Sequence, residues 1–453
     1  MPNNLQLTPD AMRAFGYRVI DILVDHLTTL EQRPVSTQRT RAELSARLGT
    51  DFAEEPTAPD EVLDTVERDV LGSITHVDHP RFYAFVPGPG NFVGTMADAL
   101  AAGFNVFAGH WLAASGPGAV ELQTVDWLRR VCGLPDGAGG LFVSGGSMAN
   151  LTALATARRV RLGGPDPAAV VYYSDQTHNS LAKGLRVLGF VEQQFRAIPA
   201  DETQRLPLNR LREAIAADRA AGRRPFCVVA NAGTTNTGAV DPLEAIAAVC
   251  REEGLWLHVD GAYGAAAALS PRGRAVLRGL ELADSITLDP HKWLFQPFEI
   301  GCVLVRDLRH LHATFAVHPE DQATYLEDVG RMAEREVVFY EHGIQLTRSF
   351  RALKLWMSLR VFGVRAFREA IERGIALAEE AERMLRADDR WEVVTPAQLA
   401  VVTFAPARPE LTLAERNALV QRAVEQLVAD GYAMVTSTQV GERVVLRFCL
   451  IHP

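Results

Sequence analysis

The chain has 453 residues, of which 22% are charged and 48% are hydrophobic, and its formal net charge is −9. This composition is typical of a soluble globular protein, and the length predicts two or three domains. The negative charge is spread along the chain, which argues against a nucleic-acid partner. The polar first residues and the lack of a long apolar stretch predict no signal peptide and no membrane span, and they favour a cytoplasmic location.

The five cysteines are scattered, mostly within apolar runs. They form no Cys-x-x-Cys pair, and no cluster of histidines and cysteines has the spacing of metal ligands. We therefore expect reduced, mostly buried thiols and no bound metal.

The N-terminal part is predicted to be helical. Apolar residues recur at helical spacing from Phe15 to Leu30, after a helix-start signal at Thr8-Pro9-Asp10, and a polar-rich helix pair follows at about 41–72. Such an apolar stripe is most often ordinary core. Aromatic residues then lead into a Pro/Gly loop at 79–90, which by itself indicates a strand and turn at the edge of the core, and a helix is expected at 96–102.

From Gly139 onward short apolar strands alternate with segments long enough to hold helices, which predicts a mostly parallel sheet covered on both faces. The expected strands are 141–143, 170–173, 190–195, 227–231, 256–260, 285–288 and 302–305. A smaller α/β domain follows, with helices at 352–362, 367–385 and 413–430, strands at 391–394 and 399–404, and a strand pair at 433–449.

Two of the strands end in side chains that suit pyridoxal phosphate. Asp260 closes the strand 256–260, and Lys292 follows the strand 285–288 within Asp289-Pro290-His291-Lys292-Trp293. A lysine amine can bond covalently to the aldehyde of this cofactor, while a carboxylate keeps its pyridine nitrogen protonated. The alternative reading of Lys292 is a surface lysine whose stem lies along apolar neighbours.

Strand 141–143 opens into Ser144-Gly145-Gly146-Ser147-Met148, and a helix follows. Glycines at such a turn let backbone N–H groups and the helix N-terminus face an anion. Alone, this pattern is more often a plain turn. In chain order before the lysine motif it predicts a phosphate cradle, with Ser147 supplying a hydroxyl and Met148 a backbone donor.

The run His258-Val259-Asp260-x-Ala262-Tyr263, followed by Asp-Pro-His-Lys-Trp, resembles the group II pyridoxal-phosphate decarboxylases, and most closely the aromatic-L-amino-acid decarboxylase branch. The resemblance runs from about Arg13 to Leu450. It implies an α/β fold of type I, like aspartate aminotransferase, with a mostly parallel seven-stranded sheet. It also implies a helical dimerisation arm (1–75), a large cofactor-binding domain (76–350) and a small C-terminal α/β domain (351–453).

The same resemblance assigns roles around the cofactor. His178, in a polar loop where a histidine is usually solvated, would stack on the pyridine ring. Thr235 would orient Asp260, Ala262 would pack under the ring, and His291 would lie next to the phosphate. Asp289 is a weak cofactor candidate because its charge would repel a phosphate, and Arg348 would support the phosphate or the catalytic loop.

The resemblance further implies a homodimer whose active sites are shared between subunits. The expected substrate pocket is formed by Phe85, Val86, Pro87, Phe107, Gly109 and Trp111. Gly109 stands where animal aromatic decarboxylases have phenylalanine. Tyr325, on a polar loop at 318–326, would reach the neighbouring subunit's site and protonate the substrate carbanion; its alternative reading is an aromatic anchor for a flexible loop.

The predicted activity is that of a carboxy-lyase, which converts an L-amino acid to the amine and carbon dioxide. The expected substrate is aromatic: tryptophan, tyrosine, phenylalanine or a hydroxylated derivative. The alternatives are a decarboxylase of a non-aromatic amino acid, a decarboxylation-dependent aldehyde synthase and an inactive scaffold that binds the cofactor. An aminotransferase is disfavoured, because the arginine that binds its substrate carboxylate has no clear counterpart.

Overall fold

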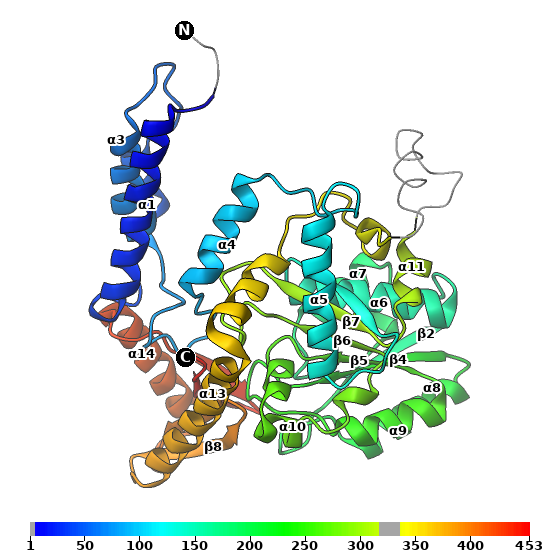
Figure 1. Cartoon of the computed structure of the whole chain (residues 1–453). Coiled ribbons are helices and arrows are strands. Elements are labelled where there is room, and N and C mark those ends of the chain that lie inside the picture. Colours follow the sequence, from blue (N-terminus) through cyan, green and yellow to red (C-terminus); the bar gives the residue numbers. More distant parts are fainter. Residues whose placement is uncertain (1–4, 317–335) are drawn as a thin grey trace.

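The computed structural model of the chain describes residues 5–316 and 336–453. Its larger part is built on a seven-stranded sheet with the strand order β1-β7-β6-β5-β4-β2-β3 (Figure 1). The strands are β1 (Gly139–Val143), β2 (Ala169–Ser174), β3 (Phe195–Ile198), β4 (Arg224–Asn231), β5 (Trp256–Asp260), β6 (Ser285–Leu288) and β7 (Gly301–Val305). Strands β2 to β6 pair in parallel, and β7 runs antiparallel to both of its neighbours. The mostly parallel sheet predicted from the sequence is confirmed.

Helices cover both faces of this sheet because neighbouring side chains on each strand point to opposite faces. Val228 and Leu257 pack with the helices α5 (Ser115–Val131), α8 (Leu208–Ala220) and α9 (Leu243–Glu253). Val229 and Trp256, one position along, pack with α6 (Gly146–Leu162) and α7 (Ser180–Val187) on the other face. The short helices α10 (Pro271–Val276) and α11 (Arg309–Phe315) complete this part.

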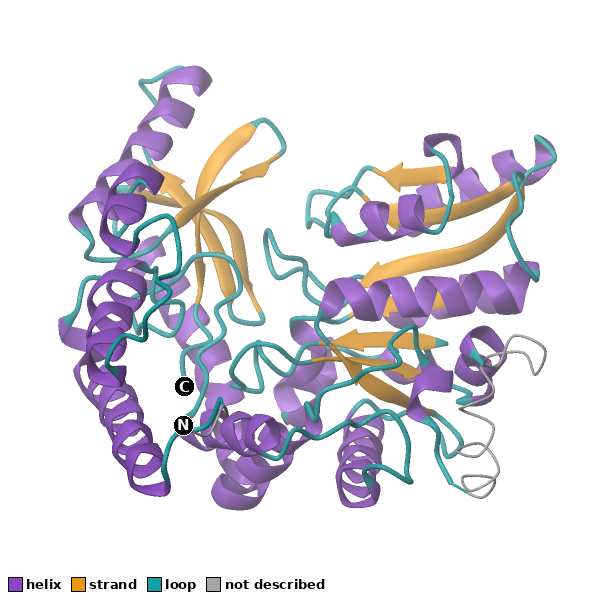
Figure 2. Cartoon of the chain, turned by 90° about the horizontal axis from the view of Figure 1, so that it is seen from above, coloured by secondary structure: helices purple, strands orange, loops and turns teal. Residues whose placement is uncertain are grey.

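The smaller part contains a four-stranded antiparallel sheet in the order β10-β11-β9-β8. Its elements are β8 (Trp391–Gln398), β9 (Val401–Pro406), α14 (Leu413–Asp430), β10 (Thr436–Val440) and β11 (Arg443–Cys449). Figure 2 shows this sheet and the larger one lying apart, each with its own helices. The long helix α13 (Ala352–Arg386) packs against α4 (Phe92–Gly103), α5 and the strands β8 and β9, and so joins the two parts.

The helix α13 breaks at Gly363, whose φ of 74° and ψ of 151° are not helical. A positive φ is accessible to glycine without the steric cost that a side chain would add. This break lies between the two helices predicted at 352–362 and 367–385. The sequence therefore predicted the position of the break in α13, although the structure has one kinked helix there and not two separate ones.

Several predicted strands differ in their bounds: those expected at 391–394 and 399–404 are β8 and β9, and the one expected at 190–195 is the most displaced. The apolar run 190–195 was expected to be a strand, but β3 begins only at Phe195 and a short 3₁₀ turn precedes it. Phe190 is buried because its ring stacks on that of Phe226, with 5.6 Å between the ring centroids. Its hydrophobicity thus reflects packing against β4 and not pairing in the sheet.

The N-terminal helices α1 (Pro9–Thr29), α2 (Arg41–Leu48) and α3 (Pro59–Thr65) form an arm beside the rest of the chain (Figure 1). The segment that follows pairs with the small sheet region, since the Tyr83 N–H donates to the Met434 carbonyl at 2.8 Å. The predicted domain boundaries at 75 and 350 stay predictions. Among the described residues, none of the helices combines the length and hydrophobicity that crossing a lipid bilayer requires.

Candidate active site

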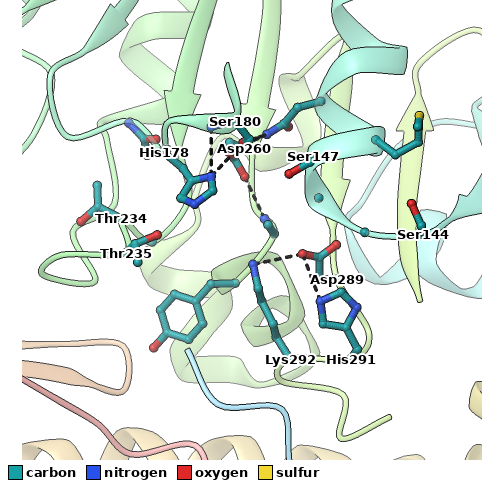
Figure 3. A pocket seen from close by; sticks show the side chains of 18 residues that line it. Ser144, Ser147, His178, Ser180, Thr234, Thr235, Asp260, Asp289, His291 and Lys292 are labelled. Atoms are coloured by element: carbon teal, nitrogen blue, oxygen red, sulfur yellow. Dashed lines mark hydrogen bonds and ion pairs between the residues drawn. The ribbon is translucent and has the colours of Figure 1, made fainter. Parts of the chain in front are cut away.

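A cavity of about 280 Å³ lies where the carboxyl ends of β1, β2, β4, β5 and β6 meet. Ligands collect at this edge in open α/β sheets because the connecting loops diverge there. All eight residues that the sequence predicts to bind the cofactor line the cavity: Ser147, Met148, His178, Thr235, Asp260, Ala262, His291 and Lys292. Figure 3 shows His178 and Asp260 facing Lys292 across this cavity from separate segments of the chain.

The start of α6 forms one wall of the cavity. A Cβ on Gly146 would lie 2.8 Å from the Asp289 carboxylate, and one on Gly145 would lie 3.3 Å from the His291 ring, so glycine keeps this wall open. The Met148 N–H donates to the Gly145 carbonyl at 3.0 Å, so the predicted role of Met148 as a backbone donor to the phosphate stays a prediction. Within the described residues the N–H groups of Gly146 and Ser147 have no such partner. These two N–H groups and the partial positive charge of the helix suit a phosphate.

Asp260 faces the cavity from the end of β5 and is held by two donors. The Asn150 side-chain amide donates to Oδ2 at 2.9 Å, and the Ala262 N–H donates to Oδ1 at 3.2 Å. The prediction that Thr235 orients Asp260 is not what the structure shows. Thr235 lines the cavity, but among the described residues the orienting side chain is Asn150 of α6.

Asn150 is fixed in turn by a chain of buried hydrogen bonds. The Trp256 indole N–H can only donate, and it bonds to Ser285 Oγ at 2.8 Å, so the Ser285 hydroxyl is free to donate to His258 Nδ1 at 2.9 Å. His258 then carries its proton on Nε2 and donates to Asn150 Oδ1 at 2.9 Å. The Asn150 amide group is therefore oriented toward Asp260.

Burial lowers the pKa of His258 to about 4, so this imidazole is neutral near pH 7. A neutral histidine adds no charge next to Asp260 and leaves the direction of donation in the chain unchanged. The network presents the Asp260 carboxylate to the cavity already oriented by the donors Asn150 and Ala262.

Lys292 follows β6, and its amine lies 3.0 Å from Asp289 Oδ2 in an ion pair. The Asp289 side chain is 2% exposed, and His291 Nε2 is 3.6 Å from the same oxygen. The sequence made Asp289 only a weak candidate for binding the cofactor, because its charge would repel a phosphate. The structure instead places its carboxylate beside the reactive amine, where Lys292 partly balances its charge.

His178 lies on the opposite side of the cavity from Lys292 (Figure 3). Its Nδ1 accepts the Ser180 N–H at 3.3 Å and is 2.8 Å from the Ser180 hydroxyl, which itself accepts from Asn150. Burial lowers the pKa of His178, although the charge of Asp260 acts in the other direction. The ring is therefore neutral, with its proton on Nε2.

The residues predicted to form the substrate pocket are not part of the cofactor cavity of the single chain, and their role in a site shared between subunits stays a prediction. Phe85, Val86, Pro87, Phe107, Gly109 and Trp111 do not line the cavity that contains Lys292. Phe107 nevertheless explains the glycine at position 109, because a Cβ there would come within 2.6 Å of the Phe107 ring and 2.8 Å of the Leu346 carbonyl oxygen. The ring of Phe107 fills the space that a larger residue at position 109 would need.

Among the described residues Arg348 bonds to neither the phosphate wall nor Lys292, and the catalytic loop that it was also predicted to support lies outside them. Its guanidinium bonds to the Glu121 carboxylate at 2.5 Å and to the carbonyls of Ala108 and Phe142 at 2.8 and 3.0 Å. The Arg348 and Glu121 side chains are each 1% exposed. This buried pair ties α5 and the 107–111 segment to β1, directly before the phosphate wall.

Tyr325, the predicted proton donor, lies outside the described residues. The prediction from sequence also overlooked Asn150, Ser180 and Tyr263, which line the cavity. Asn150 lies one helical turn after Ser147, and its spacing could have suggested that it faces the same site. Tyr263 stacks on Trp293 with ring centroids 5.0 Å apart, so Trp293, directly after the reactive lysine, packs against a side chain of the same cavity.

Similarity to known proteins agrees with this geometry. The sequence profile of the pyridoxal-dependent decarboxylase conserved domain matches residues 42–406. The chain is 49% identical to an aromatic-L-amino-acid decarboxylase of Bacillus atrophaeus, over 100% of this chain and 94% of that protein.

Two solved structures are also similar. The crystal structure of Oryza sativa TDC with PLP and tryptamine has a TM-score of 0.92 and 32% identity, covering 100% of this chain and 95% of that one. The crystal structure of Rhodiola rosea 4-hydroxyphenylacetaldehyde synthase has a TM-score of 0.90 and 30% identity, and the match covers 99% of this chain and 94% of that one. The glycine wall, the oriented carboxylate and the lysine fit pyridoxal phosphate on their own chemistry, and with these matches they show that the chain belongs to the pyridoxal-dependent decarboxylase family.

Proposed function

We propose that this enzyme removes the carboxyl group of an aromatic L-amino acid and releases the amine and carbon dioxide. The observation that carries the proposal is the convergence of Lys292, Asp260 and the start of α6 in one cavity at the sheet edge. The aromatic substrate class is supported by the 49% identity to the aromatic-L-amino-acid decarboxylase of Bacillus atrophaeus.

Each group in the cavity has a separate task. Pyridoxal phosphate, when bound, supplies an aldehyde that condenses with amines and a protonated ring that accepts electrons. The N–H groups of Gly146 and Ser147 would hold its phosphate, and Asp260 would hold the proton on its ring nitrogen. Because Asn150 and Ala262 already orient Asp260, the carboxylate does not have to reorganise when charge on the ring changes.

Lys292 must lose a proton before its amine can attack an aldehyde. Asp289 Oδ2, 3.0 Å from the amine, is within reach of that proton. His178, neutral and with its Nε2–H directed away from Ser180, can stack on a ring or donate to a carboxylate. These residues bind, orient and move protons, while the cofactor accepts the electrons.

A second copy of the chain would complete the site. The helix α1 has no buried residue, and the apolar side chains of Tyr17, Ile20, Val24 and Leu27 on it are between 38% and 65% exposed. Such a surface suits burial in a two-fold interface. We infer a homodimer in which Tyr325 of one subunit protonates the substrate carbon in the site of the other.

The five cysteines, all free and buried, support the predicted cytoplasmic location.

An aldehyde synthase is the second candidate, because the similar structures include the 4-hydroxyphenylacetaldehyde synthase of Rhodiola rosea. In that reaction oxygen consumes the carbanion and yields aldehyde, ammonia and hydrogen peroxide. The tyrosine at position 325 favours the amine, since a hydroxyl can supply the proton that a phenylalanine cannot.

The test is a substrate screen with the purified holoenzyme. L-Tryptophan, L-tyrosine, L-phenylalanine, L-dopa and 5-hydroxytryptophan are compared with L-glutamate, and amine, carbon dioxide and hydrogen peroxide are quantified together. We expect amine and carbon dioxide in equal amounts from at least one aromatic substrate. Preference for glutamate would refute the aromatic assignment, and hydrogen peroxide in proportion to carbon dioxide would favour the synthase.

The shared site has its own test. Tyr325→Phe subunits are mixed with Lys292→Ala subunits, each inactive in amine formation as a homodimer. In a heterodimer one site combines an intact Lys292 with an intact Tyr325 from the neighbour, so amine formation should recover. Verified heterodimers that bind cofactor and form no amine would contradict the shared site.

A further inference from the structure

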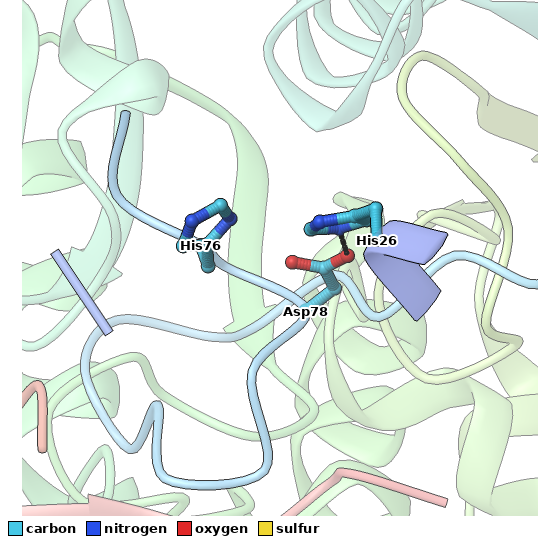
Figure 4. Close-up of side chains that lie close together, drawn as sticks. All are labelled: His26, His76 and Asp78. Carbon is cyan, nitrogen blue, oxygen red and sulfur yellow. Dashed lines mark hydrogen bonds and ion pairs between the residues drawn. The ribbon is translucent and has the colours of Figure 1, made fainter. Parts of the chain in front are cut away.

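Three side chains that commonly bind metals meet at the base of the N-terminal arm, away from Lys292. His26 lies near the end of α1, and His76 and Asp78 lie on the turn at 76–79 after the arm (Figure 4). One ligating atom from each lies within 4.8 Å of the other two. His26 Nε2 is 2.9 Å from Asp78 Oδ2, although the two residues are 52 positions apart. Spacing along the sequence could not reveal this group, which is why the sequence predicts no metal.

His76 is buried without a hydrogen-bond partner. His76 is 8% exposed, and its buried Nδ1 has no hydrogen-bond partner among the described residues. Buried polar atoms are nearly always paired, because leaving one unpaired costs on the order of 1–3 kcal/mol. Burial lowers the pKa of His76, so its ring is neutral and can offer a lone pair.

The neighbouring histidines are already committed to backbone groups. His79 Nδ1 accepts the Arg81 N–H at 2.9 Å, and its Nε2 donates to the Arg33 carbonyl at 3.2 Å. His452 Nε2 bonds to the backbone carbonyl of Asp78 at 3.1 Å and not to its carboxylate. Burial acts to raise the pKa of Asp78, but the hydrogen bond from His26, the charge of His26 and a backbone hydrogen bond together outweigh it, and the pKa is lowered. The three remaining side chains are therefore an ionised carboxylate and two imidazoles.

We propose that His26, His76 and Asp78 bind a divalent transition-metal ion of the zinc class. Two imidazoles and one carboxylate are ligands that zinc prefers, and water would take the remaining position. Ligand atoms about 2.05 Å from a tetrahedral zinc ion lie about 3.3 Å apart. The observed separations, 2.9 Å for one pair and at most 4.8 Å for the others, require side-chain shifts of roughly an ångström to reach this geometry.

The site is accessible to solvent in the single chain, and a metal bound there would affect the structure of the arm. The side chains of His26 and Asp78 are 22% and 25% exposed, and they line a groove of about 280 Å³ together with Leu23, Leu27 and Phe298. A metal there would tie α1 to the segment that continues into residues 79–90. Phe298 packs on the His291 ring, with 4.9 Å between centroids, and separates the groove from the active-site cavity. The expected role is to stabilise the arm and not to take part in the reaction.

The experiment measures zinc binding to the tag-free, full-length holoenzyme. The protein is stripped with a chelator, dialysed and titrated with zinc chloride by calorimetry, and the bound metal is counted after gel filtration by elemental analysis. We expect one zinc ion per chain and a zinc-dependent rise in the thermal midpoint. Loss of one ligand in His76→Gln, Asp78→Asn or His26→Gln should weaken binding at least about tenfold and abolish the rise.

His452→Gln is the matched control, because it alters a histidine that touches Asp78 only through the backbone, and it should bind zinc like the parent. Circular dichroism verifies folding, and cofactor absorbance in the same samples distinguishes loss of zinc from loss of pyridoxal phosphate. Because His26 and Asp78 are more exposed than His76, His26→Gln and Asp78→Asn are less able than His76→Gln to disturb the core. No zinc in the parent, or equal zinc in the parent and all three ligand variants, would overturn the proposal.

Discussion

The buried pair of Arg348 and Glu121 makes the most direct energetic prediction. Arg348→Met keeps an unbranched apolar stem but removes the guanidinium, which bonds to Glu121 and to the carbonyls of Ala108 and Phe142. Glu121 then keeps a charge at a site that is 1% exposed. Its one remaining donor among the described residues is the Phe142 N–H at 3.0 Å.

The expected loss of unfolding free energy is about 3–5 kcal/mol, because removing one member of a buried ion pair leaves the other charge uncompensated. The double variant Glu121→Gln/Arg348→Met leaves no charge, and its amide can still accept the Phe142 N–H. We therefore expect the double variant to be more stable than Arg348→Met alone by roughly 1–2 kcal/mol, which an additive model does not predict.

Urea unfolding followed by circular dichroism measures these differences. Protein and pyridoxal phosphate concentrations are held constant, since whatever binds the folded state shifts its apparent stability. Arg212→Met removes a guanidinium from the exposed pair of Arg212 and Glu252 and serves as the matched control, with an unchanged midpoint expected. If a natively folded Arg348→Met variant loses less than about 1 kcal/mol of unfolding free energy, the pair of Arg348 and Glu121 does not stabilise the fold as argued.

Three further predictions concern the cavity. Lys292→Ala should abolish amine formation while the protein still takes up cofactor, because the reactive amine is gone; activity within tenfold of the parent would contradict this role. Asn150→Ala should raise the dissociation constant of pyridoxal phosphate by roughly 10-fold to 100-fold in a fluorescence titration, since Asp260 loses a hydrogen bond to a charged group. His258 has an ordinary pKa near 6.5 and a folded pKa of about 4, so the unfolded chain binds more protons between these values and stability falls as the pH decreases from 6.5 to 4. In His258→Gln that contribution, up to about 3 kcal/mol, should disappear, and the stability gap to the parent should narrow on acidification; a constant gap would show that His258 does not titrate in this window.

The contact between Asp289 and Lys292 changes how the lysine motif is understood. From the sequence, an aspartate next to a phosphate site looked unfavourable, because only the phosphate was considered as its neighbour. In the folded chain the reactive amine itself is the neighbour, at 3.0 Å. Charge complementarity within the site, which depends on the turn after β6, decides the role of this residue.

Local patterns were sufficient for most of the elements. Alternating apolar strands separated by helix-length segments predicted the mostly parallel sheet, and Gly363 lies between the two predicted halves of α13. The error at 190–195 has a local cause, since the burial of Phe190 against Phe226 has the same sequence signature as a short strand. Bounds of short elements depend on contacts that neighbouring residues in the sequence do not report.

By itself the sequence determined that Ser147, His178, Asp260 and Lys292 line one cavity, because in a parallel sheet every strand end reaches the same edge and the residues that follow each strand must meet there. What only the tertiary structure decided is how those residues are held. Asn150 and not Thr235 orients Asp260, Arg348 pairs with Glu121, and His26 meets His76 and Asp78. Each of these contacts joins positions far apart in the chain, and their geometry depends on side-chain packing in three dimensions, which no short-range pattern in the sequence encodes.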